Sequence, residues 1–275
     1  MADMAKVFGS SGKDSRAGAP VSEPCVMIIF GASGDLTKRL LVPALYNLAC
    51  DGLLSDNFAV LGVGRGEMND GEFRQRMASD KDGLRAFHTR GTFDEAAAEA
   101  LIGRFHYSKA DINVSDFRIL KQRVGELDAE YGAKGNVLFY FAMAPRFFGP
   151  LCDTLYEAGF QEGPGWKRII VEKPFGTDLA SALTLNEEIL RNWDESQIYR
   201  VDHYLGKETV QNLLAFRFSN GMFEPLWNNS QIDNIQFNVC ESVDVQGRAS
   251  YYEGSGVLRD MMQNHMFQML AYLCM

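Results

Sequence analysis

Long hydrophobic runs are absent from this sequence. No apolar run in the 275 residues reaches the ~18 residues that a membrane-spanning helix needs, so no membrane partner is expected. Residues 1–20 are rich in Gly, Ser, Ala and Lys and lack the apolar core of a secretory signal. We therefore interpret residues 1–24 as a disordered tail and expect a cytoplasmic protein.

Cysteine and positive charge are also scarce. The five cysteines are odd in number and widely spaced, and no pair has metal-ligand spacing. They are expected to be buried, small apolar residues in a reducing cytosol, and no metal site is predicted. A net charge of −9 argues against nucleic-acid binding, which needs a basic surface. An anionic small substrate would need a local cationic pocket.

Histidine is scarce as well, with four in the chain, but two of these lie in segments typical of chemistry. His203 lies within residues 200–208, and His265 ends the segment 259–265; each has a carboxylate and cationic groups nearby. Histidine accepts and returns a proton near neutral pH, so a base and an anionic substrate are indicated. His88 and His106 are interpreted as lone histidines, ordinary surface or helix residues.

The first part of the chain alternates strands and helices. The apolar run 25–30 predicts a strand buried on both faces, and leucines at helical spacing follow it up to Gly52. Residues 58–65 are a second strand, which completes a parallel β-α-β unit. Further strands are predicted near 105–107, 137–143 and 168–174, with a helix over 178–192. The fold class is therefore α/β, with a Rossmann-like doubly wound parallel sheet over residues 25–200.

The pattern changes beyond residue 200. Residues 232–241 alternate in the manner of an antiparallel strand, and residues 257–275 return to helical spacing. The apolar end of that helix needs a partner surface. We interpret residues 201–275 as the beginning of an incomplete α+β substrate and dimerisation domain with an antiparallel sheet.

A phosphate site is predicted at the first strand-to-helix turn. Small residues at Gly31-x-x-Gly34 let backbone N–H groups and the helix N-terminus approach a pyrophosphate. The spacing departs from G-x-G-x-x-G, so an ordinary tight turn is the alternative, but the flanking strand and helix favour the phosphate site. Arg65 ends the second strand, where NAD-selective proteins place an acid, and the nearest acid, Glu67, lies beyond the turn. This favours NADP over NAD; the alternative is a solvated surface arginine.

Four segments together resemble the signatures of the glucose-6-phosphate dehydrogenase family. They are residues 31–38, 172–176, 202–208 and 259–265, in the family's order and spacing, and the resemblance covers residues 25–275. It implies an oxidoreductase that oxidises glucose 6-phosphate to 6-phosphogluconolactone, with hydride transfer to NADP, in the first step of the oxidative pentose phosphate pathway. It also implies a homo-oligomer, a dimer or tetramer, for full-length members.

The resemblance assigns roles to individual residues. His265 matches the base, and Asp202 matches the carboxylate that orients it. Asp202 alone could equally cap a helix. The implied cofactor contacts are Gly31, Ala32, Ser33, Gly34, Asp35, Leu36, Arg65, Tyr140 and Lys173. The implied contacts to glucose 6-phosphate are Lys173, His203, Tyr204, Lys207, Glu241 and Asp260.

Two departures from the family pattern limit this reading. Leu40 stands where the family carries a lysine, although Arg39 could substitute for it. Family members are also much longer, so we expect the dinucleotide domain to fold and the chain alone to be weak or inactive. The alternatives are a non-catalytic NADP-binding protein, and another sugar oxidoreductase with a Glu-Lys-Pro motif; the latter group lacks the segment 202–208.

Overall fold

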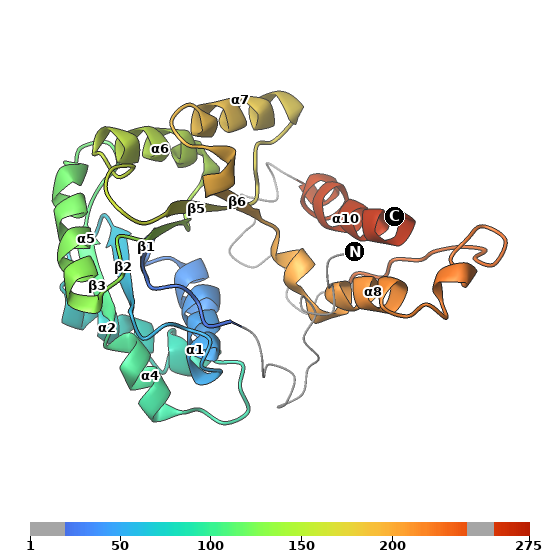
Figure 1. Ribbon diagram of the computed structural model, residues 1–275, viewed down its shortest axis with the longest axis horizontal. Helices are drawn as coiled ribbons and strands as arrows, with labels where there is room; N and C mark the ends of the chain where they lie inside the picture. The colour runs from blue at the N-terminus through green and yellow to red at the C-terminus, as the bar shows by residue number, and fades with distance from the viewer. Residues whose placement is uncertain (1–19, 241–255) are drawn as a thin grey trace. The chain divides into compact units, whose positions relative to one another are not determined.

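A computed structural model describes residues 20–240 and 256–275. The chain divides into two compact units, one from Gly18 to Val201 and one that includes Asp202–Met275 (Figure 1). Within the described residues, every helix is too short or too polar to span a membrane. Each unit is described by itself below.

The first unit is built on a parallel sheet of six strands in the order β3-β2-β1-β4-β5-β6. The order reverses between β1 and β4, and in such sheets ligands bind at the carboxyl ends of the strands beside this switch point. The prediction of a doubly wound sheet is confirmed. The strands are β1 (Cys25–Phe30), β2 (Phe58–Gly64), β3 (Phe105–Lys109), β4 (Val137–Phe141), β5 (Lys167–Glu172) and β6 (Ile198–Val201).

Helices cover both faces of this sheet (Figure 1). Side chains of β1 alternate between the faces, as the pleat of a strand requires. Ile28 packs in the cluster that contains α5, α6 and α7, whereas Ile29 packs in the cluster that contains α1, α2 and α4. The helices are α1 (Val42–Cys50), α2 (Asp70–Ala78), α3 (Leu84–Phe87), α4 (Glu95–Ile102), α5 (Phe117–Tyr131), α6 (Phe148–Glu157) and α7 (Leu179–Leu190).

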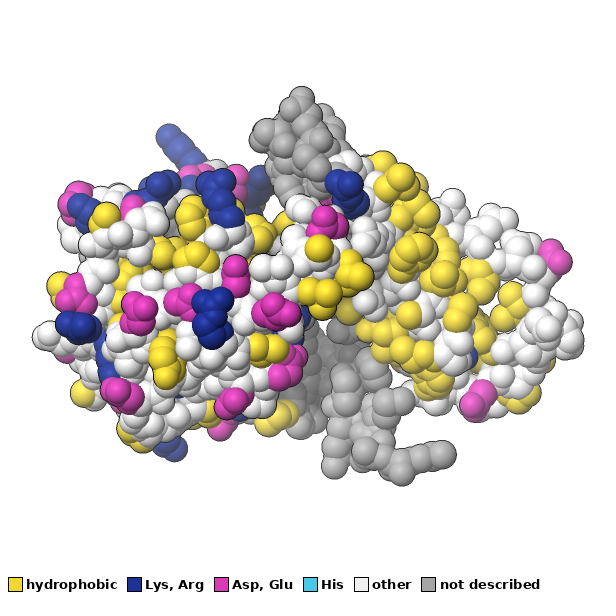
Figure 2. All heavy atoms as spheres, turned by 90° about the horizontal axis from the view of Figure 1, so that it is seen from above, with side chains coloured by type: hydrophobic (Ala, Val, Ile, Leu, Met, Phe, Trp, Pro, Cys, Tyr) yellow, Lys and Arg dark blue, Asp and Glu magenta, His cyan; other side chains and the backbone are white. Residues whose placement is uncertain are grey.

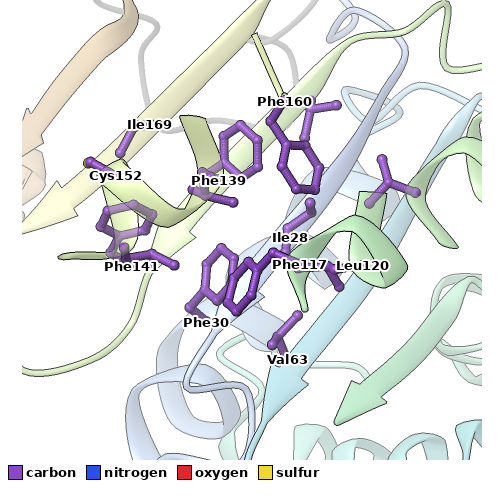
Figure 3. Close-up of a cluster of buried hydrophobic side chains, with 14 of the residues drawn as sticks. Ile28, Phe30, Val63, Phe117, Leu120, Phe139, Phe141, Cys152, Phe160 and Ile169 are labelled. Carbon is purple, nitrogen blue, oxygen red and sulfur yellow. The ribbon is translucent and has the colours of Figure 1, made fainter. Parts of the chain in front are cut away.

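Aromatic side chains fix the ends of β1 and β4 against α5. Figure 3 shows Phe30, Phe117 and Phe141 among the buried residues of this cluster. The ring of Phe30 stacks on Phe117 at 6.1 Å between centroids and meets Phe141 edge-on at 5.8 Å. Such pairs contribute about 0.5–1.5 kcal/mol beyond their buried area. The packing therefore holds the two strand ends that flank the switch point in fixed positions.

The second unit is helical where it is described. A 3-10 turn (His203–Gly206) precedes α8 (Glu208–Phe218). A π-helical turn (Leu258–Met266) continues into α10 (Phe267–Cys274). Residues 232–240 are irregular, so the prediction of an antiparallel strand from Ile232 is wrong over that part. A strand needs a partner for its backbone N–H and C=O groups, and the described residues of this unit offer none.

Burial corrects two further expectations. His106 lies in β3 and is 4% exposed, so it is neither a surface nor a helix residue. Cys25 and Cys152 are buried as expected, and burial raises the pKa of each thiol to about 12. Cys240 and Cys274 are exposed, which contradicts the expectation for them. A single residue type does not reveal which side of a helix or loop faces the core.

The second unit has a small core and a large exposed apolar surface. Among its described residues, the buried hydrophobic cluster consists of Tyr204, Val210 and Met269, whereas the first unit has two extensive clusters. Figure 2 shows hydrophobic side chains gathered on its surface. Large apolar patches mark surfaces that other protein covers. The exposed residues include Phe216, Phe218, Met222, Leu226, Val257, Leu258, Met262, Phe267, Leu270 and Met275.

Candidate active site

The turn after β1 is fixed by hydrogen bonds to β2. The backbone N–H groups of Gly31 and Ala32 both donate to the carbonyl of Val63, at 3.0 and 3.1 Å. Gly31 has a φ of +84°, and a Cβ there would lie 2.2 Å from the carbonyl oxygen of Ala142. Only glycine fits both the backbone angle and the space. The turn is therefore held between β2 and the residue that follows β4.

Backbone donors remain available before the π-helix Thr37–Leu41, which follows the turn and continues into α1. The N–H of Gly34 closes the turn on the carbonyl of Gly31 at 2.9 Å. Among the described residues, no acceptor pairs with the N–H groups of Ser33, Asp35 and Leu36. Unpaired N–H groups at a helix N-terminus bind phosphate readily. Gly34 is exposed and has an ordinary φ, so glycine is not needed there for the backbone angle. Its missing side chain instead leaves these N–H groups open to a ligand.

Arg65 follows β2 directly and is exposed. It forms no hydrogen bond or ion pair within the part of the chain that the structure describes. Glu67, the nearest acid, is paired with Lys109 of β3. Among the described residues, the loop therefore presents Arg65 without an anionic partner, whereas the carboxylate of Glu67 is already paired with Lys109.

Leu40 is exposed, and the two cationic residues before it each contact another side chain. Leu40 is 57% exposed. Arg39 lies over the ring of Phe87 at 5.0 Å, and buried Lys38 forms an ion pair with Asp82 at 2.6 Å. Both neighbouring cations thus have partners within the first unit.

Tyr140 lies in β4 and is 7% exposed. Its hydroxyl donates a hydrogen bond to the carboxylate of Glu172 at the end of β5. Burial, and after it the neighbouring Glu172, raises the pKa of Tyr140 far above its usual value, so the phenol keeps its proton. Sequence reasoning included Glu172 in the segment 172–176 but gave it no role; it immediately precedes Lys173 and the cis Lys173–Pro174 bond.

His265 and Asp202 meet in the second unit although they are 63 positions apart in the sequence. His265 is 2% exposed, and its Nδ1 lies 2.9 and 3.1 Å from the two carboxylate oxygens of Asp202. Asp202 also accepts a hydrogen bond from the N–H of Tyr204 at 2.9 Å, which caps the 3-10 turn. The capping and orienting roles of Asp202 therefore coexist.

Aromatic and cationic groups surround this pair. The ring of Tyr204 stacks on His265 at 4.3 Å, and the Nζ of Lys207 lies 3.8 Å from the centre of the same ring. His203 meets His265 edge-on at 5.1 Å. The structure thus brings together Asp202, His203, Tyr204, Lys207 and His265. Asp260 lies half-buried on the turn that carries His265, and Glu241 lies outside the described residues.

The same group could also hold a metal ion. One ligand atom from each of Asp202, His203 and His265 lies within 4.8 Å of the others. The expectation of no metal rested on cysteine spacing, which does not detect a set assembled from distant residues. Two imidazoles and a carboxylate suit a divalent transition metal, but the Nδ1 of His265 is directed at Asp202.

Two residues that sequence reasoning did not identify hold the C-terminal end of the unit. Arg217 of α8 donates to the carbonyls of Tyr272 and Leu273 at 2.8 and 2.6 Å, and Trp227 donates to Leu273 at 2.7 Å. These bonds satisfy carbonyls that a helix end leaves unpaired. They hold the helix that continues from His265, and an arginine within a helix carries no sequence signal of such a contact.

Comparison with protein families agrees with this geometry. The NAD binding domain of glucose-6-phosphate dehydrogenase matches residues 28–212, and the C-terminal domain of the same family matches residues 214–275. The chain belongs to the glucose-6-phosphate dehydrogenase family.

Individual relatives agree with the assignment. Glucose-6-phosphate 1-dehydrogenase of Aggregatibacter actinomycetemcomitans is 46% identical over 255 residues, which are 92% of this chain and 51% of the relative. The Bacillus subtilis protein of the same name is 43% identical over 251 residues, 91% of this chain and 50% of the relative. The chain spans about half the length of these relatives.

Solved structures of the family share the fold. A glucose-6-phosphate dehydrogenase in complex with glucose 6-phosphate superposes with a TM-score of 0.82 at 34% identity, covering 94% of this chain and 52% of that one. The Mycobacterium avium enzyme gives a TM-score of 0.76 at 33% identity, covering 92% and 52%.

Proposed function

We propose that this chain carries the cofactor-binding and proton-transfer residues of an NADP-dependent glucose-6-phosphate dehydrogenase. Residues 25–200 would form the NADP-binding domain and residues 201–275 the beginning of the substrate domain. The observation that supports this most directly is the pair formed by buried His265 and half-buried Asp202, with His203 and Lys207 in the same unit.

His265 acts as the general base in this proposal. A carboxylate only accepts hydrogen bonds, so a neutral His265 carries its proton on Nδ1, and its lone pair lies on Nε2. Nε2 removes the proton of the anomeric hydroxyl, and Asp202 stabilises the imidazolium that forms. NADP, held by the residues described below, would supply the nicotinamide that takes up the hydride of the anomeric carbon.

The remaining residues bind the substrate. The phosphate of glucose 6-phosphate carries close to two negative charges, so fixed cations are required against the net charge of −9. Lys207 supplies a permanent positive charge and His203 a ring N–H donor, with Tyr204 beside them. We assign the sugar hydroxyls to Glu241 and Asp260, and Lys173 to both sugar and cofactor.

The cofactor residues fit NADP. The N–H groups of Ser33, Asp35 and Leu36 suit the pyrophosphate, and Gly31 and Ala32 form the turn that presents them. Arg65 has no competing partner among the described residues and suits the 2′-phosphate. Glu67 is paired with Lys109, which disfavours its use for the 2′-hydroxyl of NAD. Tyr140 belongs to the wall of this site.

A direct test measures absorbance at the reduced-nicotinamide band with the purified chain, glucose 6-phosphate, and either NADP or NAD. The same assay is repeated with the chain extended to the length of its relatives. Reduction of NADP by the extended chain supports the proposal, and its loss in His265→Asn assigns that turnover to the pair. An extended chain that binds NADP but reduces none of it would refute the proposal.

A second candidate is a non-catalytic NADP-binding protein. The small core and exposed apolar surface of the second unit favour it for the 275-residue chain alone. This candidate predicts NADP binding without turnover, and early hydrogen exchange in residues 202–240 and 256–275. Turnover by the 275-residue chain itself would exclude it.

A further inference from the structure

The loop that carries Arg65 is attached to the neighbouring strand β3 rather than standing free. The hydroxyl of Tyr107 donates to the carbonyl of Gly66 at 2.9 Å. Lys109, two residues further along β3, pairs with Glu67. Side chains two residues apart project from the same face of a strand. One face of β3 therefore holds the two residues that follow Arg65.

The Tyr107 contact depends on a glycine in β2. Gly64 has an ordinary φ, but a Cβ there would lie 2.8 Å from the Tyr107 hydroxyl. The ring carbons of Tyr107 would lie 3.7 Å away, which is ordinary contact. A Cβ at position 64 would thus displace the hydroxyl, whereas the backbone angle there does not call for glycine. Burial raises the pKa of Tyr107, so the hydroxyl remains a donor at neutral pH.

The far end of the loop is anchored to the same strand. The carboxylate of Asp70, at the start of α2, accepts from the N–H of Tyr107 and from the ring of His106, each at 2.8 Å. Arg123 of α5 lies 3.3 Å from the same carboxylate. Residues 65–69 are therefore held at both ends by β3, and the guanidinium of Arg65 is left to bind a ligand.

We propose that Tyr107 is a positioning residue for cofactor selectivity: its hydrogen bond to Gly66 holds Arg65 where it binds the 2′-phosphate of NADP. This rests on the proposed NADP function. Tyr107 acts through the loop backbone and discriminates NADP from NAD because only NADP places an anion at Arg65.

The experiment measures the dissociation constants of NADP and NAD for the 275-residue chain by isothermal titration calorimetry. Tyr107→Phe removes only the hydroxyl, so NADP is expected to bind about three- to tenfold more weakly, with NAD unchanged within about twofold. Gly64→Ala displaces the hydroxyl sterically and should give the same loss of selectivity. In a Tyr107→Phe background, Gly64→Ala should add little, because the clashing oxygen is gone.

The matched control is Tyr46→Phe. It removes a buried hydroxyl that accepts a hydrogen bond from the backbone N–H of Asp94 at 2.6 Å and is not part of the hydrogen bonds that anchor the loop. Its NADP-to-NAD ratio should equal that of the parent. Equal weakening of both nucleotides by Tyr107→Phe would indicate a merely structural role and overturn the inference.

Arg65→Ala separates this inference from the proposed function. If it abolishes selectivity for NADP while Tyr107→Phe leaves selectivity intact, the inference fails and the NADP function stands. If Arg65→Ala leaves selectivity unchanged, or the parent chain binds neither nucleotide, the cofactor assignment itself fails and this inference with it. In the expected case, Tyr107→Phe has no further effect on selectivity in an Arg65→Ala background.

Discussion

Two glycines of the turn after β1 should respond differently to the same added methyl group. At Gly31 an alanine must adopt a φ of +84°, which by itself costs about 1–3 kcal/mol. Its Cβ would also lie 2.2 Å from the backbone oxygen of Ala142, whose N–H bonds Phe30 at 3.0 Å. Because backbone rather than a flexible side chain must move, we expect Gly31→Ala to lower the free energy of unfolding by at least about 2 kcal/mol.

Gly34→Ala should affect binding instead. Its φ is ordinary, and its Cβ would lie 3.1 Å from the oxygen of Gly31, a contact that a shift of a few tenths of an ångström relieves. Loss of glycine flexibility in the unfolded chain offsets part of that cost, so stability should change by less than about 1 kcal/mol. The methyl group stands at the exposed entrance to the N–H groups of Ser33 and Asp35. We therefore expect NADP affinity to fall at least about tenfold.

Urea unfolding and NADP titration of both variants provide the measurement. Gly52→Ala is the matched control, because Gly52 has a φ of +64° with no atom within 4 Å of an added Cβ, so it reports the backbone cost alone. Gly31→Ala should be less stable than Gly52→Ala. Parent-like NADP binding by Gly34→Ala would refute the phosphate site, and parent-like stability of Gly31→Ala would refute the packing argument.

Three further predictions concern ionisable groups. In the extended chain, His265→Asn should lower kcat by about 10³-fold or more with little change in sugar binding, since it removes the base; parent-like turnover would exclude that role. His203→Asn should mainly raise the KM for glucose 6-phosphate, and an unchanged KM would contradict a phosphate contact. Burial alone would raise the pKa of Asp70, but its hydrogen bonds from Tyr107 and His106 and the charge of Arg123 outweigh burial and hold it below 3.8. Its ionised form therefore stabilises the fold above pH 3.8, and this contribution is lost as pH falls through the folded-state pKa. Asp70→Asn should thus be less stable than the parent by about 1–3 kcal/mol at pH 7. In urea unfolding across pH, that difference should shrink below pH 3.8, and a difference independent of pH would contradict the assignment.

Local patterns were sufficient for much of the first unit, although they did not predict β6 (Ile198–Val201) or α6 (Phe148–Glu157). The apolar run of β1 predicts a strand buried on both faces, and all six of its residues are buried. The helix that begins after the turn and the strand ending at Gly64 follow from leucine spacing and from glycine at the boundaries. Such features depend on neighbours within a few residues, which the sequence displays directly. The four family segments were likewise recognised from the order and spacing of their residues alone.

Contacts between distant residues could be decided only by the tertiary structure. Asp202 and His265 are 63 positions apart, and neither periodicity nor spacing shows that one carboxylate both caps a turn and holds the imidazole. The irregular course of residues 232–240 has the same origin, because a strand forms only where another strand pairs with it. His106 is buried, and Tyr107 reaches Gly66, because β3 packs beside β2 and against α5. The sequence determined the alternation of elements and the residue types available for chemistry; folding decided which of them meet, since hydrogen bonding and packing act through space rather than along the chain.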